Sequence, residues 1–221
     1  MKGILVTIDG PAGSGKSSVA RHVAGRLGLV NLNTGAAYRA AALIALREGA
    51  DLSDGQKIAD LARRIGLDPE GASIDGRRVP DPDLRTPEVA AAASKVSANP
   101  GLREVLLPVQ RAAADGARER GGAVVEGRDI GTVVLPDAEL KVFLSADPEE
   151  RARRRARQTG REGELDRIRE AISRRDRQDS EREASPLKPA PDAVVLDTTS
   201  LDLEEVVSRV LDLASGLRRG A

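Results

Sequence analysis

The sequence predicts an α/β fold in which helices cover both faces of a parallel β-sheet. Apolar runs of strand length alternate along the chain with longer segments of helical periodicity, as in parallel sheets with crossover helices. The run GILVTI at residues 3–8 carries no charge, which is typical of a central strand buried on both faces. Val19 and Val23 then recur at helical spacing over residues 16–27, and Gly28 is placed to end that helix.

The remaining elements follow the same alternation. We expect further strands at residues 29–32, 122–127, 140–146 and 193–198. We expect further helices at residues 35–48, 54–65, 86–97, 101–119, 148–158, 167–182 and 203–217. Residues 51–85 are dense in Pro, Gly and Asp beyond their one helix, so they predict an insert with only short extended pieces. The chain as a whole, residues 1–221, fits one domain with such elaborations.

The composition excludes several classes of function. Basic and acidic residues number 35 each, so a net charge of zero gives no long-range attraction to nucleic acid or to an acidic membrane. The absence of Cys and the single histidine, His22, exclude disulfides, thiolate catalysis and metal centres built from Cys or several His. One Tyr, one Phe and no Trp leave no aromatic platform for stacking bases. No apolar run approaches about 18 residues and the chain begins as a strand, so we expect a soluble, cytoplasmic protein.

The segment between the first strand and the first helix has the pattern of a phosphate-binding loop. It reads GPAGSGKS and fits G-x-x-x-x-G-K-[ST] at every fixed position. Glycines let backbone amides turn toward phosphate oxygens, and the helix N-terminus adds its positive end. Lys16 is expected to reach the β- and γ-phosphates, and the Ser17 hydroxyl to ligate Mg²⁺. The sequence therefore predicts a nucleoside triphosphate site formed by Gly10, Pro11, Ala12, Gly13, Ser14, Gly15, Lys16, Ser17 and Ser18.

This phosphate-binding loop, or P-loop, occurs in switch GTPases, in mechanical ATPases and in kinases. An N-K-x-D motif for guanine is absent from the sequence, which argues against a GTPase. A mechanical ATPase usually needs a longer chain and a partner surface. Arginines recur beyond the loop, which favours a second phosphorylated substrate, because transfer between two anions needs cations on both sides of the transition state.

Three places supply arginines near expected strand ends, which is where open α/β sheets bind ligands. In chain order they hold Thr34, Tyr38 and Arg39 after the second strand, Arg128 and Asp129 after the third, and Arg175, Asp179 and Arg182 on the helix at 167–182. The last set continues, at helical steps, the apolar face of Leu165, Ile168 and Ile172. An apolar stripe that becomes charged without leaving its face predicts a charged ligand at its end.

Plainer interpretations remain open for several of these charges. Arg39 is also compatible with a solvated helix charge. Arg175 and Asp179 are also compatible with a surface ion pair four residues apart, which contributes about 0.3–0.5 kcal/mol.

A basic helix is expected at 148–158, between a start signal at Asp147 and a break at Gly160. Arg151, Arg154 and Arg155 lie on neighbouring turns, so one face of this helix could close over the triphosphate as a lid. The alternative is a surface helix whose arginines pair with nearby acids.

Five segments, in this order, resemble bacterial cytidylate kinases: IDGPAGSGKSS, NTGAAYRAAAL, RTPEVAAAASKVSANPGLREVLLPVQR, VVEGRDIGTVVLPDAELKVFLSA and RRDRQDSEREASPLKPAPDAVVLDTT. The resemblance covers nearly the whole chain. It implies phosphorylation of CMP and dCMP to CDP and dCDP in pyrimidine nucleotide metabolism, with ATP as donor, Mg²⁺ as cofactor and direct in-line transfer. It also implies a monomer with the nucleoside monophosphate kinase fold, a monophosphate-binding insert at approximately 54–97 and a short helical lid at approximately 148–165.

The resemblance further implies roles for individual positions. Those matching cytosine-recognition residues are Ser94, Arg103 and Asp129, those matching holders of the acceptor's α-phosphate are Thr34, Arg39 and Arg128, and those matching sugar-binding residues are Tyr38, Arg175 and Asp179. Arg182 matches a phosphate-facing arginine, which gives Lys16, Arg128 and Arg182 as catalytic candidates. Arg151 and Arg155 are added to the ATP site as lid arginines.

Two positions depart from the resembled pattern. Asn33 stands where an acid is common, and Glu126 stands where Asp is usual at the end of the third strand. Alternatives stay open beside CMP phosphorylation: a kinase for UMP or another monophosphate, or a regulatory or RNA-associated P-loop ATPase. The preference between CMP and dCMP is also open.

Overall fold

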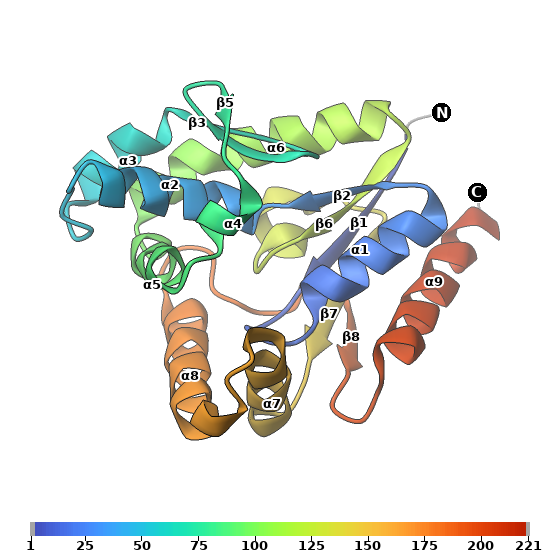
Figure 1. Cartoon of the computed structure of the whole chain (residues 1–221). Helices are drawn as coiled ribbons and strands as arrows, with labels where there is room; N and C mark the ends of the chain where they lie inside the picture. Colours follow the sequence, from blue (N-terminus) through green and yellow to red (C-terminus); the bar gives the residue numbers. More distant parts are fainter. Residues whose placement is uncertain (1–2, 220–221) are drawn as a thin grey trace. The chain divides into compact units, whose positions relative to one another are not determined.

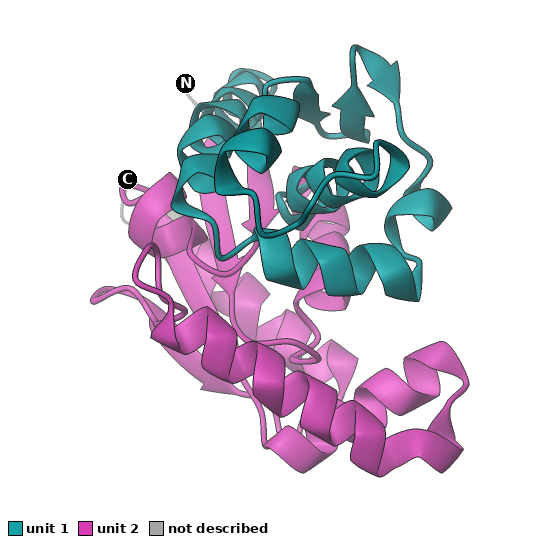
Figure 2. Cartoon of the chain, turned by 90° about the vertical axis from the view of Figure 1, so that its left-hand side faces the viewer, with its two compact units in different colours: residues 1–3, 32–122 teal, residues 4–31, 123–221 magenta. Residues whose placement is uncertain are grey.

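The computed structural model of the chain describes residues 3–219 and divides into two compact units (Figures 1 and 2). Unit 1 comprises residues 1–3 and 32–122, and unit 2 comprises residues 4–31 and 123–221. Each unit has its own hydrophobic core, and each is described here by itself.

A five-stranded sheet forms the framework of unit 2. Its order is β2-β6-β1-β7-β8, and its strands are β1 (Ile4–Asp9), β2 (Val30–Asn33), β6 (Gly122–Glu126), β7 (Leu140–Ser145) and β8 (Val194–Asp197). The pairs β1–β7 and β7–β8 are parallel. The uncharged run at the start of the chain is the central strand, and from Leu5 onward every residue of β1 is buried. The predicted class, a parallel sheet with helices around it, is confirmed.

Helices α1 (Lys16–Leu27) and α9 (Leu203–Arg219) pack together in the core of unit 2. Val19 and Val23 of α1 meet apolar residues of β1, β7 and β8 there, as their helical spacing predicts. Gly28 ends α1 in the left-handed conformation at φ 67°, which a glycine adopts without steric cost.

Helices α7 (Pro148–Thr159) and α8 (Leu165–Glu181) pack against each other, with the short helix η2 (Glu162–Glu164) in their connection. Asp147 caps α7 by accepting from the Glu149 backbone N–H at 2.8 Å, and Gly160 ends it at φ 63°, both as predicted. The apolar face of α8 buries Ile168 and Ile172 in a small core with two alanines of α7.

Unit 1 is mainly helical. It contains α2 (Gly35–Arg47), α3 (Gly55–Ala62), β3 (Ile65–Asp68), β4 (Gly71–Ile74), β5 (Arg77–Arg78), α4 (Asp81–Leu84), α5 (Pro87–Val96) and α6 (Pro100–Glu119). The Ala-rich helix α2 lies in its core, where small side chains let neighbouring helices approach closely. Asn99 caps α6 through the Leu102 N–H at 3.1 Å, so the Asn-Pro break between the two predicted helices is confirmed.

One local prediction was wrong, and one element was not expected. The helix expected at 54–65 ends at Ala62, because Ile65 already pairs with Ile74 in an antiparallel sheet of β3, β4 and β5. The second difference is the segment after β6, for which no element was expected. There Ile130–Val134 forms a π-helical turn, η1. Such single turns are frequent at functional sites.

No helix within residues 3–219 combines the length and the apolar character that crossing a membrane requires.

The small core between α7 and α8 gives a stability prediction. Ile172→Ala should lower the free energy of unfolding by about 2–4 kcal/mol, because it removes three buried carbons from a cluster that alanines cannot refill. Chemical denaturation followed by circular dichroism would measure this. Ala171→Ser, on the exposed neighbouring position of the same helix, is the control and should cost about 0.5 kcal/mol or less. Equal losses from both variants would contradict the packing described here.

Candidate active site

The predicted P-loop connects the end of β1 to the start of α1 and is built on close backbone approaches. A Cβ atom on Gly10 would lie 2.1 Å from the Leu144 carbonyl oxygen, and one on Gly13 would lie 2.9 Å from the Arg151 carbonyl oxygen. Both glycines also have positive φ, at 145° and 76°. Gly15, at φ 88°, is the residue from which α1 begins. The loop therefore requires its glycines for steric and conformational reasons.

Lys16 is buried at the start of α1, with its ammonium group held inside the P-loop. Its Nζ donates to the Pro11 carbonyl oxygen at 2.5 Å and to the Ser14 hydroxyl at 3.3 Å. Burial lowers the pKa of Lys16, and the neighbouring Arg128 lowers it further, whereas Glu126 and Asp9 oppose the shift. Lys16 thus lies near other cations, and the carboxylates of Glu126 and Asp9 partly offset their positive charge.

Ser17 and Glu126 form an oxygen-rich pair next to the P-loop. The Ser17 hydroxyl donates to Oε2 of Glu126 at 2.7 Å, and Glu126 is the last residue of β6 and is buried. The longer Glu side chain, in place of the usual Asp, reaches the hydroxyl directly. No cluster of three or more acidic, His or Cys side chains suited to a metal occurs among the described residues. A hydroxyl and a carboxylate nevertheless suit Mg²⁺, which keeps several water ligands.

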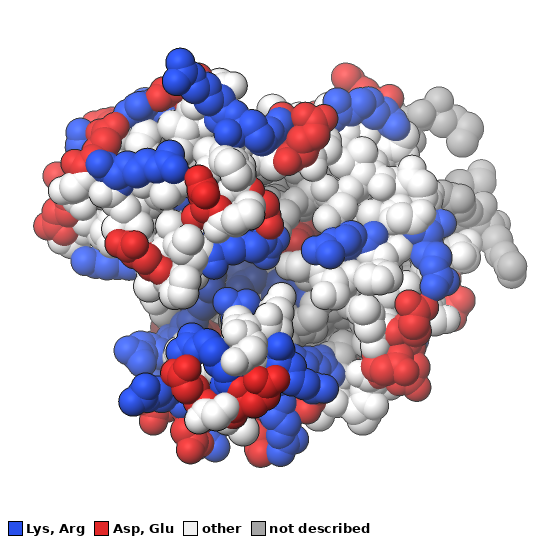
Figure 3. Space-filling view, viewed as in Figure 1, with Lys and Arg blue, Asp and Glu red and all other residues white. Residues whose placement is uncertain are grey.

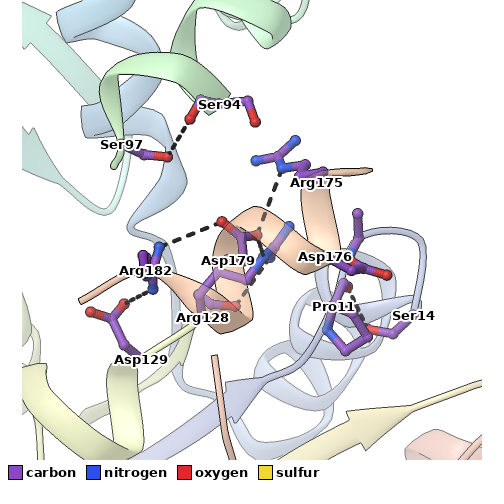
Figure 4. A network of polar contacts seen from close by, with 12 residues as sticks. Pro11, Ser14, Ser94, Ser97, Arg128, Asp129, Arg175, Asp176, Asp179 and Arg182 are labelled. Atoms are coloured by element: carbon purple, nitrogen blue, oxygen red, sulfur yellow. Dashed lines mark hydrogen bonds and ion pairs between the residues drawn. The ribbon is translucent and has the colours of Figure 1, made fainter. Parts of the chain in front are cut away.

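The two arginine sites of unit 2 meet at Asp179 (Figure 4). Asp179 Oδ2 accepts from Arg128 Nε at 3.2 Å and lies 3.9 Å from Arg175 Nε, while its Oδ1 lies 3.5 Å from an Arg182 nitrogen. A second nitrogen of Arg182 lies 3.9 Å from Oδ1 of Asp129. The sequence-distant sets after β6 and at the end of α8 are therefore one cluster.

Burial decides between the two interpretations of this charged stripe. The side chains of Asp179 and Arg182 are only 5% and 4% exposed, so neither belongs to a solvated ion pair. Arg175 is 35% exposed and lies at the edge of the cluster. Arg182 follows the last helical residue, Glu181, and donates through Nε to the Ser185 carbonyl oxygen at 2.5 Å. Three guanidinium groups around one carboxylate favour an additional anion as ligand.

The candidate residues of unit 1 form smaller groups. Arg103 lies with its guanidinium carbon 5.2 Å from the centre of the Tyr38 ring, and it donates to the Tyr38 hydroxyl at 3.3 Å and to the Ser97 carbonyl oxygen at 2.7 Å. The remaining candidates are Thr34, buried at the start of α2, and Ser94, half-buried on α5. Tyr38 and Arg103 are thus brought together across a sequence separation of 65 residues.

Arg39 donates to the side-chain oxygen of Asn33 at 3.3 Å. Its side chain is therefore hydrogen-bonded within unit 1, so the solvated helix charge considered from the sequence does not describe it. The neutral amide of Asn33 orients the guanidinium without bringing a carboxylate charge to it. Asn33 thus affects this candidate phosphate site directly.

Arg151 and Arg155, the two arginines predicted to belong to a lid, have different surroundings. Arg151 is buried, and its guanidinium donates to the Ala146 carbonyl oxygen at 2.9 Å and to the Ala12 carbonyl oxygen at 3.1 Å. It also forms an ion pair with Asp176 of α8, whose other oxygen accepts from the Ala12 N–H at 3.3 Å. Arg155 is exposed and donates to Gln158 at 3.0 Å. Arg151 therefore fixes α7 to the P-loop backbone.

The rest of α7 resembles a solvated helix in part. Arg153 pairs with Glu149, and Arg154 and Arg157 pair with Glu150. In the space-filling view, basic and acidic side chains alternate over the region of α7 and α8 (Figure 3). The sequence alternative of arginines paired with nearby acids thus holds for Arg153 and Arg157, whereas Arg154 also donates to the Thr198 hydroxyl at 2.9 Å.

Two carboxylates of the site were not predicted from the sequence. Asp9, the last residue of β1, accepts from the backbone N–H groups of Ile130 and Gly131 at 3.0 and 2.8 Å. Asp176 connects α8 to Ala12 and Arg151. The signal for Asp9 was available, since a carboxylate at the carboxyl end of a buried strand lies where ligands bind. Asp176 gave no such signal among the many charges of its helix.

The chain is similar to known proteins over nearly its whole length. The family model "Cytidylate kinase" matches residues 6–216. The chain belongs to the cytidylate kinase family. The cytidylate kinase of Exiguobacterium sibiricum is 45% identical over 225 residues, covering 98% of this chain and 99% of that protein. The cytidylate kinase of Rhodococcus opacus is 47% identical over 221 residues, covering 96% and 95%. These matches span both units of the chain.

Solved structures support the fold. A gluconokinase from Sinorhizobium meliloti superposes with a TM-score of 0.50 at 18% identity, covering 100% of this chain and 94% of that one. At this identity the similarity shows the shared fold and does not bear on the substrate.

The buried carboxylate of Asp9 gives a pH-dependent prediction. Burial raises the pKa of Asp9 from 3.8 to about 6, against the lowering effect of its two backbone hydrogen bonds. The folded protein therefore holds this proton more tightly than the unfolded chain, so Asp9 stabilises the fold most below about pH 4 and this contribution is lost as pH rises through about 6. Its size is at most roughly 3 kcal/mol.

Comparison of the wild type with Asp9→Asn isolates this contribution. The unfolding free energy of the wild type minus that of the variant should fall between pH 4 and pH 7, because the amide does not titrate. Urea denaturation at several pH values would measure the difference. A difference that is independent of pH, or that grows with pH, would show that the carboxylate is not raised in pKa.

Proposed function

We propose that this chain transfers the γ-phosphoryl group of ATP to CMP and dCMP, forming ADP with CDP or dCDP. The observation that carries the proposal is the arrangement of cations in unit 2. Lys16 of the P-loop is close enough to Arg128 for that arginine to lower its pKa, and Arg128 joins Arg175 and Arg182 around Asp179. Cations for a triphosphate and cations for a second phosphate thus occur side by side. Membership in the cytidylate kinase family supports CMP as the acceptor.

The proposed chemistry depends on positioning and charge neutralisation. A phosphate oxygen of CMP, already ionised at neutral pH, attacks the γ-phosphorus in line with the departing ADP oxygen, so no general base is required. The charge of the transferring group is spread over its equatorial oxygens, where Lys16, Arg128 and Arg182 act as catalytic cations. The burial of the Lys16 and Arg182 side chains strengthens this effect, because charge interactions are stronger where water is excluded.

Mg²⁺ is part of the proposal as the cofactor bound with ATP. Ser17 would be its protein ligand and Glu126 would hold a ligand water or the Ser17 hydroxyl, which fits their 2.7 Å hydrogen bond. A bound Mg²⁺ held there would supply positive charge to offset the negative charge of the phosphate groups. The P-loop residues 10–18, with Arg151 and Arg155, are the proposed ATP-binding set.

The CMP-binding roles are also proposals. Asp129 would accept from the 4-amino group of cytosine, which uracil lacks, and Ser94 and Arg103 would complete recognition of the base. The proposed phosphate holders are Thr34, Arg39 and Arg128, and the proposed sugar-binding residues are Tyr38, Arg175 and Asp179. The hydrogen bonds Arg39–Asn33 and Arg103–Tyr38 support these roles by orienting two of the side chains.

Several wider features stay proposals. They are an insert at about 54–97 that binds the monophosphate, a lid at about 148–165 that closes with both substrates present, a monomeric state and a cytoplasmic location, where ATP and CMP are found. A lid would protect ATP from hydrolysis by water. The zero net charge supports a small-molecule acceptor over nucleic acid.

A panel of acceptors tests the proposed function. ADP formation from ATP and Mg²⁺ would be measured with CMP, dCMP, UMP, dTMP, AMP and GMP. We expect turnover with CMP and dCMP at least about tenfold above UMP, because a site built to accept from an amino group loses that hydrogen bond with a carbonyl. Equal turnover across the panel would contradict the base-recognition roles. ADP formation without any acceptor would instead support a regulatory ATPase.

Lys16→Ala should reduce CMP-dependent turnover by about a thousandfold or more, because it removes a cation from the transferring phosphoryl group. A steady-state assay with CMP and ATP would measure this loss, and a thermal melt would confirm that the variant folds. The matched control is Lys188→Ala, which removes the same charge at an exposed position. A folded Lys16→Ala variant with turnover near that of the control would rule out the P-loop assignment.

A further inference from the structure

The π-helical turn η1 directly follows Arg128 and Asp129 in the sequence. The side chain that caps its N-terminus comes from strand β1. Its first two backbone N–H groups, those of Ile130 and Gly131, donate to the two carboxylate oxygens of Asp9 at 3.0 and 2.8 Å. Asp9 ends β1, more than 120 residues earlier in the chain. Asp9 is 5% exposed, so these are buried, charge-assisted hydrogen bonds.

Asp129 occupies the position that would ordinarily supply this cap. It is the residue immediately before the helix, and its backbone oxygen accepts from Val133 and Val134 at 2.9 and 3.2 Å. Asp is among the residues most favoured at such positions, because its side chain accepts from the first backbone N–H groups of the helix. The Asp129 side chain makes no such bond here. Its Oδ1 lies instead 3.9 Å from Arg182.

The surroundings of η1 hold this arrangement in place. A Cβ atom on Gly131 would lie 3.0 Å from the Thr7 hydroxyl and 3.2 Å from Cδ of Lys141, so the turn is seated closely against β1 and β7. The conformation of Asp129, at φ −140° and ψ 24°, lies outside the regular helical region. β1 therefore fixes both the position of the turn and the source of its cap.

We propose that Asp9 is a positioning residue for base selection, which acts by capping η1 from β1 and so keeps the Asp129 carboxylate directed away from its own helix and toward the nucleotide. This inference rests on the proposed function, in which Asp129 accepts from the cytosine amino group. Without the Asp9 carboxylate, the N–H groups of Ile130 and Gly131 need a new acceptor, and Asp129 is the nearest carboxylate in sequence. The Asp129 side chain would then turn to cap these N–H groups and would no longer be available to accept from the cytosine amino group.

The cost of burying Asp9 supports a functional reason for it. Burial raises the pKa of Asp9 to about 6, the Asp129 charge adds to this shift, and Lys16 opposes it together with the two N–H groups. A buried carboxylate of this kind is less favourable for the fold than an uncharged acceptor at neutral pH. A carboxylate has two acceptor oxygens, whereas Asn has only one oxygen and an NH₂ group that cannot accept. Only the acid caps both N–H groups while sparing Asp129.

The test compares Asp9→Asn with the wild type in the specificity constants kcat/KM for CMP and for UMP, at pH 7.5 and saturating ATP and Mg²⁺. We expect the ratio of the CMP constant to the UMP constant to fall by about tenfold or more, since a charge-assisted hydrogen bond to the base is lost. The KM for ATP should change by less than about threefold, because the glycine and lysine positions of the P-loop are unchanged. A defect confined to folding would lower both acceptors alike and leave the ratio unchanged.

Three further variants make the test specific. Glu139→Gln neutralises a carboxylate that also accepts from a β1 backbone N–H, that of Leu5 at 2.8 Å at the other end of the strand, and should leave the CMP/UMP ratio unchanged. Asp129→Ala by itself should remove most of the preference for CMP over UMP. If Asp9 acts through Asp129, adding Asp9→Asn to Asp129→Ala should lower the ratio no further.

Each outcome bears on the inference. A retained CMP/UMP ratio in a folded Asp9→Asn protein, or an additive loss in the double variant, would overturn it. Asp9→Ser, whose hydroxyl is too short to reach both N–H groups, repeats the test if Asp9→Asn does not fold. Failure of both to fold would also overturn the inference, because the bonds would then serve the fold as a whole. A wild type that does not prefer CMP would instead contradict the proposed function on which the inference rests.

Discussion

The constraint around which unit 2 is organised is a group of cations that must be held close together against their mutual repulsion. The side chains of Lys16 and Arg182 are buried, and Arg128 both contacts Asp179 beside Arg182 and lowers the pKa of Lys16. Like charges at this spacing repel strongly where water is excluded. Carboxylates held in place by the fold offset this repulsion. Asp179 is shared by three arginines, and Glu126 opposes the lowering of the Lys16 pKa. A ligand with several negative charges would complete this balance.

The parallel sheet explains how these carboxylates reach one place. Asp9 and Glu126 are the last residues of β1 and β6, which are neighbours in the sheet, so both side chains emerge at the same edge as the P-loop. The Gly127 N–H donates to the Ile8 carbonyl oxygen at 3.1 Å and continues the pairing one residue beyond β6. Arg128 and Asp129 therefore start from a backbone that β1 already positions. The pairing of these strands thus fixes the backbone positions of the site residues that follow them.

How much of this could be predicted depended on whether the information was local. The P-loop, the cap at Asp147 and the helix end at Gly160 follow from residues next to one another in sequence, and all three elements formed as expected. The burial of Asp179 also followed, because helical spacing carries it onto the face of Ile168 and Ile172. The cap that Asp9 gives to η1 could not be predicted, because it depends on β6 lying beside β1. The periodicity of a local segment does not indicate the order of strands in a sheet. The early end of the helix at Ala62 has the same cause, because pairing of Ile65 with Ile74 overrides helical propensity.

Helix α8 shows why neighbouring charges in one sequence run have separate functions. Arg175 and Asp176 are adjacent, yet consecutive residues of a helix point about 100° apart. Arg175 faces Asp179 and the arginine cluster, whereas Asp176 faces Ala12 of the P-loop and Arg151 of α7. One rigid helix thus fixes the arginine cluster around Asp179 on one face and the P-loop backbone on another. Any rotation or shift of α8 would move both sets of contacts together, so a change in its packing would alter the P-loop backbone and the arginine cluster around Asp179 at once.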